Sequence, residues 1–359
     1  MASAANMQRI FVIYNKRSSN YVRVKDEFLA KLPKLQSCTI GKYDVSQSSD
    51  FDENVTKLSK CLKDGDIAIA AGGDATASVT VNAILKSGKD VTLGVLPYGN
   101  FNDLARTLGM LSADEILGWV TGMSRRRASG AWQGEDERRS PVALAPWDAN
   151  CRRQTGRADA ARGEIVPGTT HHTIFYPLSI SINGAHWRYA ACYVTIGMTA
   201  EAVAIFDDPK IRKKMQKGHK SSWRSYIQLA SWYFKNRHKK VFIPDFKING
   251  KPQPRKTSDY AAVNGRSMSR VMKGGDDYLK PDIFRSETEK TISFPKLFVL
   301  MVRSILKRTP GHNTTGDTLT FDEPAAITLQ CEGEYRTFTD VKTIEIKKEP
   351  KKCLKVIQN

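Results

Sequence analysis

An apolar segment that runs directly into two adjacent glycines constrains the fold of this chain more than any other feature. Residues 66–71 have the composition of a short buried strand, Gly72 and Gly73 follow it, and residues 80–85 are patterned as a helix just behind. A backbone without side chains approaches phosphate oxygens closely, and the N-terminus of a helix attracts anions. This junction therefore predicts a nucleotide site.

Further strand-like and helix-like segments alternate around this junction. Strands are expected over 9–14, 38–45 and 92–97, and helices over 22–32, 52–63 and 76–86. The alternation predicts a parallel sheet in an α/β domain, where ligands sit beyond the carboxyl ends of the strands. We place this nucleotide-binding domain at residues 1–122.

The composition changes abruptly after this domain. Residues 123–172 are rich in Arg, Ala, Gly and Pro and contain no Lys, which predicts a low-complexity insertion or linker. Residues 173–359 are expected to form a mainly antiparallel β-sandwich domain, with the C-terminal residues as candidates to return to the first domain. Its expected elements include a strand over 174–183, hairpin turns at Asn183-Gly184 and Asn249-Gly250, and helices over 221–236 and 294–307.

The charge of the chain predicts an anionic partner. A formal net charge of +19 over 359 residues attracts polyanions such as nucleotide phosphates or anionic lipid headgroups. Residues 210–240 mix basic and aromatic side chains, which favours an anionic membrane surface, although packing of the aromatic side chains on the β domain is the alternative. Five lysines between 347 and 355 either add to this attraction or form a solvated tail.

Other observations limit the location and the partners. No apolar run approaches the roughly 18 residues that cross a bilayer, so any membrane contact is expected to be peripheral. Six cysteines without a Cys-x-x-Cys spacing favour a reducing cytoplasm over a disulfide or zinc scaffold. No signature of a nucleic-acid-binding fold accompanies the charge, so a specific nucleic-acid partner is not expected. A homo-oligomer is left open.

A second loop with polar side chains follows the next strand of the expected sheet. Pro97 and Gly99 form a turn, Asn102 and Asp103 follow it, and Arg106 lies on the helix beyond. The carboxyl ends of parallel strands meet at one edge of a sheet, so this loop is expected beside Gly72 and Gly73. Either loop alone is as easily an ordinary strand-to-helix turn.

The two loops together resemble the catalytic domain family of the diacylglycerol kinases, which includes sphingosine kinases and bacterial lipid kinases and is related to NAD kinases. The resemblance rests on Gly-Gly-Asp-x-Thr, on Pro-x-Gly and Asn-Asp-x-Ala-Arg in the second loop, and on motifs of the second half. The matching residues are Asn15, Gly72, Gly73, Asp74, Thr76, Asn82, Pro97, Gly99, Asn102, Asp103, Ala105, Arg106, Asn264, Gly265, Gly274, Gly275, Gly333 and Glu334.

The resemblance implies an ATP-dependent and Mg²⁺-dependent kinase that phosphorylates a lipid hydroxyl. It assigns the nucleotide to Asn15, Gly72, Gly73, Ala75, Thr76, Gly99, Asn100 and Asn102, and the substrate side to Asp103 and Arg106. Asp74 is the first candidate for the metal and for catalysis. Glu332 stands where the family has an aspartate that takes the proton of the lipid hydroxyl, and Glu334 is expected in the metal network.

The chain departs from the family pattern at three positions of the glycine-rich loops. Ala75 replaces a glycine, and its methyl group is strained if the position requires a positive φ. Asn100 and Phe101 replace Thr-Gly. These changes keep open a kinase-like protein that binds nucleotide or lipid without transferring phosphate. A kinase for a soluble substrate such as NAD is the other alternative, which Asn102, Asp103 and Arg106 disfavour.

Overall fold

The structure is a computed structural model that describes residues 7–18, 20–35, 38–99, 101–128, 171–201, 243–268, 272–273, 275–290 and 311–358. It divides into two compact units, residues 1–177 with 349–359, and residues 178–348. The insertion expected over 123–172 falls largely outside the described residues. The two helices expected over 221–236 and 294–307 and the basic aromatic stretch 210–240 fall outside them as well.

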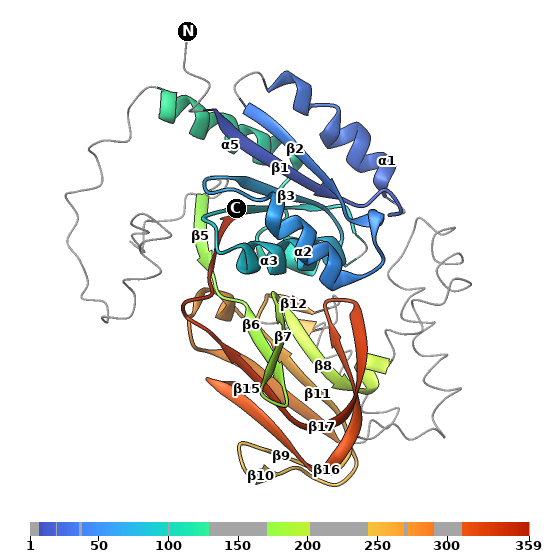
Figure 1. Ribbon diagram of the computed structural model, residues 1–359. Coiled ribbons are helices and arrows are strands. Elements are labelled where there is room, and N and C mark those ends of the chain that lie inside the picture. Colours follow the sequence, from blue (N-terminus) through green and yellow to red (C-terminus); the bar gives the residue numbers. More distant parts are fainter. Residues whose placement is uncertain are drawn as a thin grey trace, which may run out of the picture. The chain divides into compact units, whose positions relative to one another are not determined.

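The first unit is built on a six-stranded sheet in the order β2-β1-β3-β4-β18-β5 (Figure 1). Its strands are β1 (Gln8–Tyr14), β2 (Cys38–Asp44), β3 (Ile67–Gly72), β4 (Thr92–Pro97), β5 (His171–Phe175) and β18 (Leu354–Gln358). All neighbouring pairs are parallel except β5 with β18. The strands β1, β3 and β4 are almost entirely buried because helices cover both faces of the sheet, which is typical of parallel sheets, whereas the edge strand β2 exposes Thr39 and Lys42.

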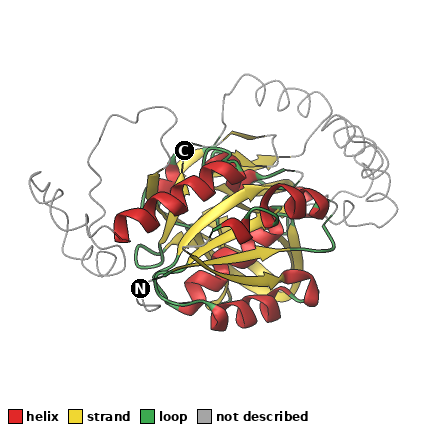
Figure 2. Ribbon diagram, turned by 90° about the horizontal axis from the view of Figure 1, so that it is seen from above, coloured by secondary structure: helices red, strands yellow, loops and turns green. Residues whose placement is uncertain are grey.

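Helices lie on the two faces of this sheet (Figures 1 and 2). They are α1 (Tyr21–Arg23), continued by a π-helical stretch over Val24–Leu29, α2 (Phe51–Cys61), α3 (Asp74–Ser87), α4 (Asp103–Thr107) and α5 (Ala113–Ala128). Val24, Phe28 and Ile116 pack with Ile10 and Ile69 in one buried cluster, so α5 and the π-helical stretch share a face. Helices α2 and α3 cover the other face.

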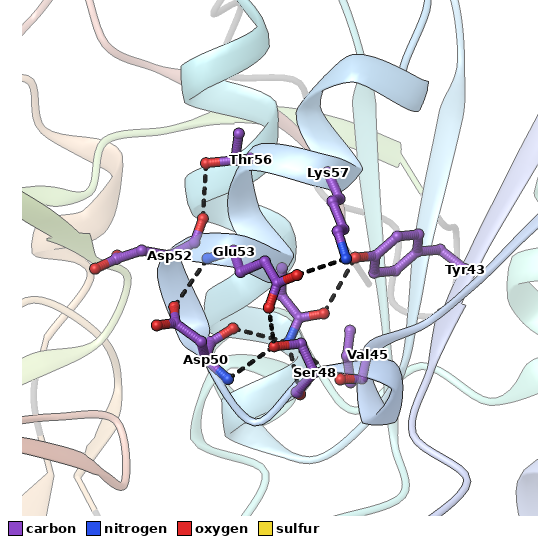
Figure 3. Close-up of polar contacts among 9 residues, drawn as sticks. Tyr43, Val45, Ser48, Asp50, Asp52, Glu53, Thr56 and Lys57 are labelled. Atoms are coloured by element: carbon purple, nitrogen blue, oxygen red, sulfur yellow. Dashed lines mark hydrogen bonds and ion pairs between the residues drawn. The ribbon is translucent and has the colours of Figure 1, made fainter.

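The start of α2 shows how local sequence fixes an element (Figure 3). The N-cap Asp50 accepts a hydrogen bond from the amide of Glu53 at 2.9 Å, and the Glu53 carboxylate accepts one from the Ser48 hydroxyl. Lys57, one turn further on, pairs with Glu53 at 2.5 Å. The bond to Asp50 satisfies a helical amide that has no intrahelical partner, and the two side-chain contacts hold Glu53 in the first turn, so the helix begins where the sequence places its cap.

The second unit contains a ten-stranded sheet whose described pairs are antiparallel. Eight strands follow the order β15-β14-β11-β8-β16-β17-β6-β7, and off this path β9 pairs with β16 and β10 pairs with β9. The bounds are β6 (Leu178–Ile182), β7 (Ala185–Ala190), β8 (Tyr193–Gly197), β9 (Phe246–Ile248), β10 (Lys251–Pro252), β11 (Thr257–Val263), β14 (Phe284–Lys290), β15 (His312–Thr314), β16 (Gly316–Cys331) and β17 (Glu334–Lys348). A separate pair joins β12 (Ser267–Met268) to β13 (Met272–Lys273).

The expected fold class is confirmed, since a parallel α/β unit is followed by antiparallel β structure. The expectation of one strand over 174–183 is wrong. That segment forms two strands, β5 in the first sheet and β6 in the second, separated at Tyr176 and Pro177. Proline cannot donate to a strand ladder, so the chain leaves one sheet at this point and enters the other.

Three of the five lysines near the C-terminus make contacts within the fold, whereas Lys351 and Lys352 are exposed. The Nζ of Lys348 is buried and donates to the carbonyl oxygens of Asp277 and Lys280. Burial lowers the pKa of Lys348 to about 7. Lys347 pairs with Glu345 at 2.9 Å, and Lys355 pairs with Asp90 at 2.9 Å. Three of the five lysines are thus engaged within the fold.

A buried carboxyl in the second unit gives a test of stability against pH. Asp259 on β11 accepts hydrogen bonds from the amide and the hydroxyl of Thr199, and burial raises its pKa from 3.8 to about 7. The folded state therefore holds a proton that the unfolded chain releases above pH 4. We expect the melting temperature of the full chain to fall between pH 5 and pH 8, and to fall less in Asp259→Asn. An equal fall in both proteins would contradict this assignment.

Candidate active site

Three loops meet at the carboxyl edge of the parallel sheet. They follow β1, β3 and β4, and β1 lies between β2 and β3, so the order of the strands reverses at this point. The side-chain amide of Asn20 donates to the carbonyl oxygen of Tyr98 at 2.8 Å, and the Tyr98 amide donates to the carbonyl oxygen of Gly72 at 3.1 Å. The loops after β1 and β4 are therefore tied to each other and to the end of β3.

The two glycine-rich loops are in direct backbone contact. A Cβ atom added to Gly99 would lie 2.4 Å from the Cα of Gly73 and 2.8 Å from Oδ1 of Asn102. A Cβ atom added to Gly72 would lie 2.5 Å from the hydroxyl oxygen of Thr76. Only glycine fits at Gly99, because the nearest obstacle there is backbone. The loops after β3 and β4 thus lie side by side, as the sequence predicted.

The N-terminus of α3 is directed at this edge of the sheet. Gly73 is its N-cap and makes no side-chain cap, and the first intrahelical bond runs from the Ala77 amide to the Gly73 carbonyl oxygen at 3.0 Å. The preceding amides, those of Asp74, Ala75 and Thr76, lie in the first turn, where a helix binds anions. This helix has 14 residues, so its dipole reinforces the amides.

Ala75 does not have the positive φ that would strain its backbone, which the sequence had left open. It is the second residue of α3, it has a helical backbone rather than a positive φ, and its side chain is exposed. Its methyl group therefore requires no distortion of the loop. Asn100, the neighbouring departure from the family pattern, lies outside the described residues.

Asp74 joins the two loops through its carboxylate. Its Oδ1 accepts a hydrogen bond from the Asp103 amide at 2.6 Å, and its Oδ2 accepts one from the Asn102 amide at 2.9 Å. Both amides begin α4, so Asp74 caps that helix from the start of α3. Burial, and next the negative charge of Asp103, raise the pKa of Asp74 to about 6. A cation bound beside these two carboxyls would favour their ionised forms and offset the free-energy cost of burying their negative charges.

Asn102 has a role that the sequence did not reveal. It adopts a left-handed backbone with φ of 56°, and its side chain accepts from the Gly99 amide at 2.6 Å and donates to the Gly99 carbonyl oxygen at 2.8 Å. Its amide group is thus committed to its own loop and holds Gly99 in place. Arg106 acts similarly, since its Nε donates to the carbonyl oxygen of Phe101 at 3.0 Å. Asn tolerates a left-handed backbone better than most residues, but that preference alone does not show which groups its side chain binds.

Asn15 and Thr76 stand at the same edge. Asn15 directly follows β1, and its Oδ1 accepts a hydrogen bond from the Arg17 amide at 2.8 Å. Thr76 is buried in the first turn of α3 and packs against Gly72. Residues assigned to the nucleotide by resemblance therefore gather on one edge of one unit, except Asn100, which is outside the described residues.

The carboxylates at this edge suit a magnesium ion bound together with phosphate. Among the described residues, no group of three or more His, Cys, Asp or Glu side chains is arranged to hold a metal. Asp74 and the buried Asp103 supply two carboxyls instead. Magnesium in nucleotide sites is commonly held by one or two carboxylates, with phosphate oxygens and waters completing the octahedron, so these residues fit the ion.

Glu332 lies in the second unit, at the turn between β16 and β17. Glu332 has φ of 51° and Gly333 has φ of 89°, and Cys331 pairs with Glu334 across the turn, as in a two-residue type I′ hairpin. The Glu332 side chain is 4% exposed and accepts a hydrogen bond from the Cys192 amide at 2.5 Å. The turn thus holds one carboxylate in a nearly closed environment. Glu334 begins β17 and is half-buried.

Comparison with known proteins finds relatives of residues 9–128, which lie in the first unit. The family model of the diacylglycerol kinase catalytic domain matches residues 9–128. A diacylglycerol kinase of Bacillus subtilis (strain 168) is 35% identical over 111 residues, which are 30% of this chain and 35% of the relative. A diacylglycerol kinase of Staphylococcus haemolyticus (strain JCSC1435) is 33% identical over 111 residues, 30% of this chain and 32% of the relative. The chain thus matches about a third of the length of these curated relatives.

The fold extends the likeness beyond the matched segment. The structure of a diacylglycerol kinase from Bacillus anthracis str. Sterne superposes with a TM-score of 0.55 at 10% identity, covering 98% of this chain and 97% of that one. At this identity the likeness concerns the fold. The resemblance is confirmed by the sequence match over residues 9–128, which fit the family model of the diacylglycerol kinase catalytic domain. Within the residues described, no helix is long and apolar enough to cross a membrane.

Proposed function

We propose that this protein is an ATP-dependent lipid kinase that phosphorylates a hydroxyl of diacylglycerol, a sphingoid base or a related lipid. The observation that carries the proposal is the junction of the two glycine-rich loops, where the first turn of α3 presents amides beside Gly73 and Gly99. Such a turn binds phosphate, and the carboxyls of Asp74 and Asp103 beside it suit the metal of a phosphoryl-transfer site.

Each group of residues is assigned a separate role in phosphoryl transfer. The α3 amides orient the phosphates, Asn102 and Arg106 hold the second loop, and Asp74 with Asp103 would hold Mg²⁺. When bound, the ion neutralises charge on the phosphates. We assign the lipid to residues 173–359 and the proton of its hydroxyl to Glu332, whose carboxylate is buried and held by Cys192. Glu334 is assigned to the metal network.

A substrate panel tests the proposal. The purified chain is incubated with ATP, Mg²⁺ and either diacylglycerol in mixed micelles, sphingosine in mixed micelles, or NAD in solution, and phosphorylated products are quantified. We expect product from a lipid and none from NAD. Phosphorylation of NAD alone would overturn the assignment, and binding of ATP without any product would establish the non-catalytic alternative.

The exposed position of Ala75 gives a prediction about the altered loop. Because its methyl group is exposed and its backbone is helical, restoring glycine removes no clash and no strain. We expect Ala75→Gly to change the KM for ATP less than about threefold and to lower stability by up to ~1 kcal/mol. Steady-state kinetics and chemical denaturation measure the two effects. A tenfold gain in ATP affinity would instead mean that the methyl group blocks the phosphates.

An anionic membrane surface is the partner that we propose for this protein, because its lipid substrate resides in a membrane. The net charge of +19 attracts anionic lipid, and peripheral contact would bring the second unit to diacylglycerol without a spanning helix. Sedimentation with vesicles tests this: binding should rise with the fraction of phosphatidylserine and fall with salt. Binding independent of both would contradict it.

A further inference from the structure

The antiparallel sheet of the second unit buries polar side chains on the face opposite its apolar core. Val194 and Ile196 on β8, and Leu329 on β16, belong to the core cluster. Alternate residues of a strand point to opposite faces, so Thr195 and Gln330 project from the other face, where the register places them directly opposite each other. Both are buried, at 0% and 1% exposure.

The Gln330 side chain keeps one hydrogen-bonding group without a partner. The Thr195 hydroxyl donates to Oε1 of Gln330 at 2.7 Å, whereas Nε2 of Gln330 is buried and has no hydrogen-bond partner among the residues that the structure describes. Rotating the amide by a half-turn does not cure this, because the oxygen would then lose its donor. Buried polar groups in folded proteins are nearly always paired, so this donor calls for an acceptor that the described part of the chain does not supply.

Gln330 lies close in the chain to the proposed base. It is the last residue but one of β16, and Glu332 is the first residue of the turn that follows this strand. Ala261, the partner of Thr195 on the next strand, contributes only a methyl group to this face. A substrate whose hydroxyl meets Glu332 would thus bring its adjoining atoms toward Gln330.

We infer that the side-chain amide of Gln330 is a binding group for the substrate, and that it donates to the ester carbonyl oxygen next to the reacting hydroxyl of an acylglycerol. The inference rests on the proposed function and narrows it. A diacylglycerol carries an acceptor-only ester on the carbon beside its hydroxyl-bearing carbon. A sphingoid base carries an ammonium group there, which donates only and cannot pair with Nε2.

The test compares two neutral lipids that differ in the carbonyl oxygens alone. A 1,2-diacylglycerol and the 1,2-dialkylglycerol of equal chain length are offered with ATP in mixed micelles. We expect the wild-type KM to be roughly three- to tenfold lower for the diacyl lipid, the worth of one neutral hydrogen bond. Gln330→Leu should raise the diacyl KM by that factor, with kcat and the dialkyl KM within twofold of wild type.

A matched variant and a second substitution guard against effects on folding. Thr328→Val alters the same strand and face two residues earlier, where the Thr328 and Thr337 hydroxyls lie 2.9 Å apart, and it should leave the preference for the diacyl lipid intact. Gln330→Glu keeps the shape but removes the donor, so it should also lose the preference. If Gln330→Leu changed the KM for both lipids equally, or if the wild type showed no preference for the diacyl lipid, the inference would be overturned. A buried water would then be the partner of Nε2.

Binding without turnover separates this inference from the proposed function. The melting temperature of the full chain is measured in micelles that contain either the diacyl or the dialkyl lipid, with no ATP present. We expect the diacyl lipid to raise it more, and the difference to vanish in Gln330→Leu. If that difference appears while no phosphate is transferred, the subsite stands and the kinase assignment fails. If phosphate is transferred but the two lipids raise the melting temperature equally, the kinase assignment stands and the subsite at Gln330 fails.

Discussion

Replacing Gly99 with alanine is expected to lower kcat/KM at least a hundredfold and to weaken ATP binding. The added Cβ would lie 2.4 Å from the Cα of Gly73, a backbone atom that cannot rotate away. The loops after β3 and β4 must then separate, and Gly99 also loses the position in which Asn102 holds both its amide and its carbonyl group. A displacement of about 1 Å at a reacting centre commonly costs a hundredfold in rate.

The control for this prediction is a glycine at which an added Cβ atom meets no neighbouring atom. A Cβ added to Gly118 on α5 would have no heavy atom within 4 Å, so Gly118→Ala should leave kinetics unchanged and stabilise the helix by up to ~1 kcal/mol. ATP binding is measured by titration calorimetry, which needs no lipid, and folding by circular dichroism. If Gly99→Ala bound ATP as the wild type does, the contact between the two loops would be irrelevant to the site.

Replacing Glu332 with glutamine is expected to lower kcat by a factor of about 10² to 10⁴ while leaving ATP binding unchanged. General-base catalysis by a positioned carboxylate is worth that much, and an amide cannot accept the proton. Glutamine retains an oxygen for the Cys192 amide, which now donates to Glu332 at 2.5 Å. The fold of the turn should therefore survive the substitution.

Two further variants distinguish the base from a merely structural acid. Glu332→Asp restores the family residue and suits the left-handed backbone at φ of 51°, so it should keep kcat within about tenfold of wild type. Glu345→Gln removes an exposed carboxylate that pairs with Lys347, and it should change nothing. Full activity in Glu332→Gln would remove Glu332 from the mechanism.

The sequence predicted elements whose causes are local. The segment from β3 into α3 could be recognised because its apolar run, its two glycines and its helical pattern adjoin in the chain. The predicted hairpin at Asn183 and Gly184, which joins β6 to β7, has a similarly local cause, since Asn and Gly tolerate the left-handed positions of a type I′ turn. The fold class follows from these alternations.

Features that depend on distant partners could not be predicted in this way. The split of residues 174–183 between two sheets depends on pairing with β18 and β17, although Pro177 marked the break. The burial of Lys348 depends on the carbonyl groups of Asp277 and Lys280, about 70 residues away. The commitment of Asn102 to Gly99 also needed coordinates, because an Asn in a glycine-rich loop is equally able to face a ligand.

The most direct test of the central claim is transfer of labelled γ-phosphate from ATP to diacylglycerol by the wild type and by Asp74→Asn. Asparagine keeps one of the two acceptors that cap α4, so the variant should fold, but it loses the charge that the metal requires. Asp50→Asn is the matched control, since Asp50 caps α2 by the same kind of bond. We predict lipid labelling by the wild type and Asp50→Asn, and at least a hundredfold less by Asp74→Asn. Equal background labelling in all three proteins would contradict a lipid kinase.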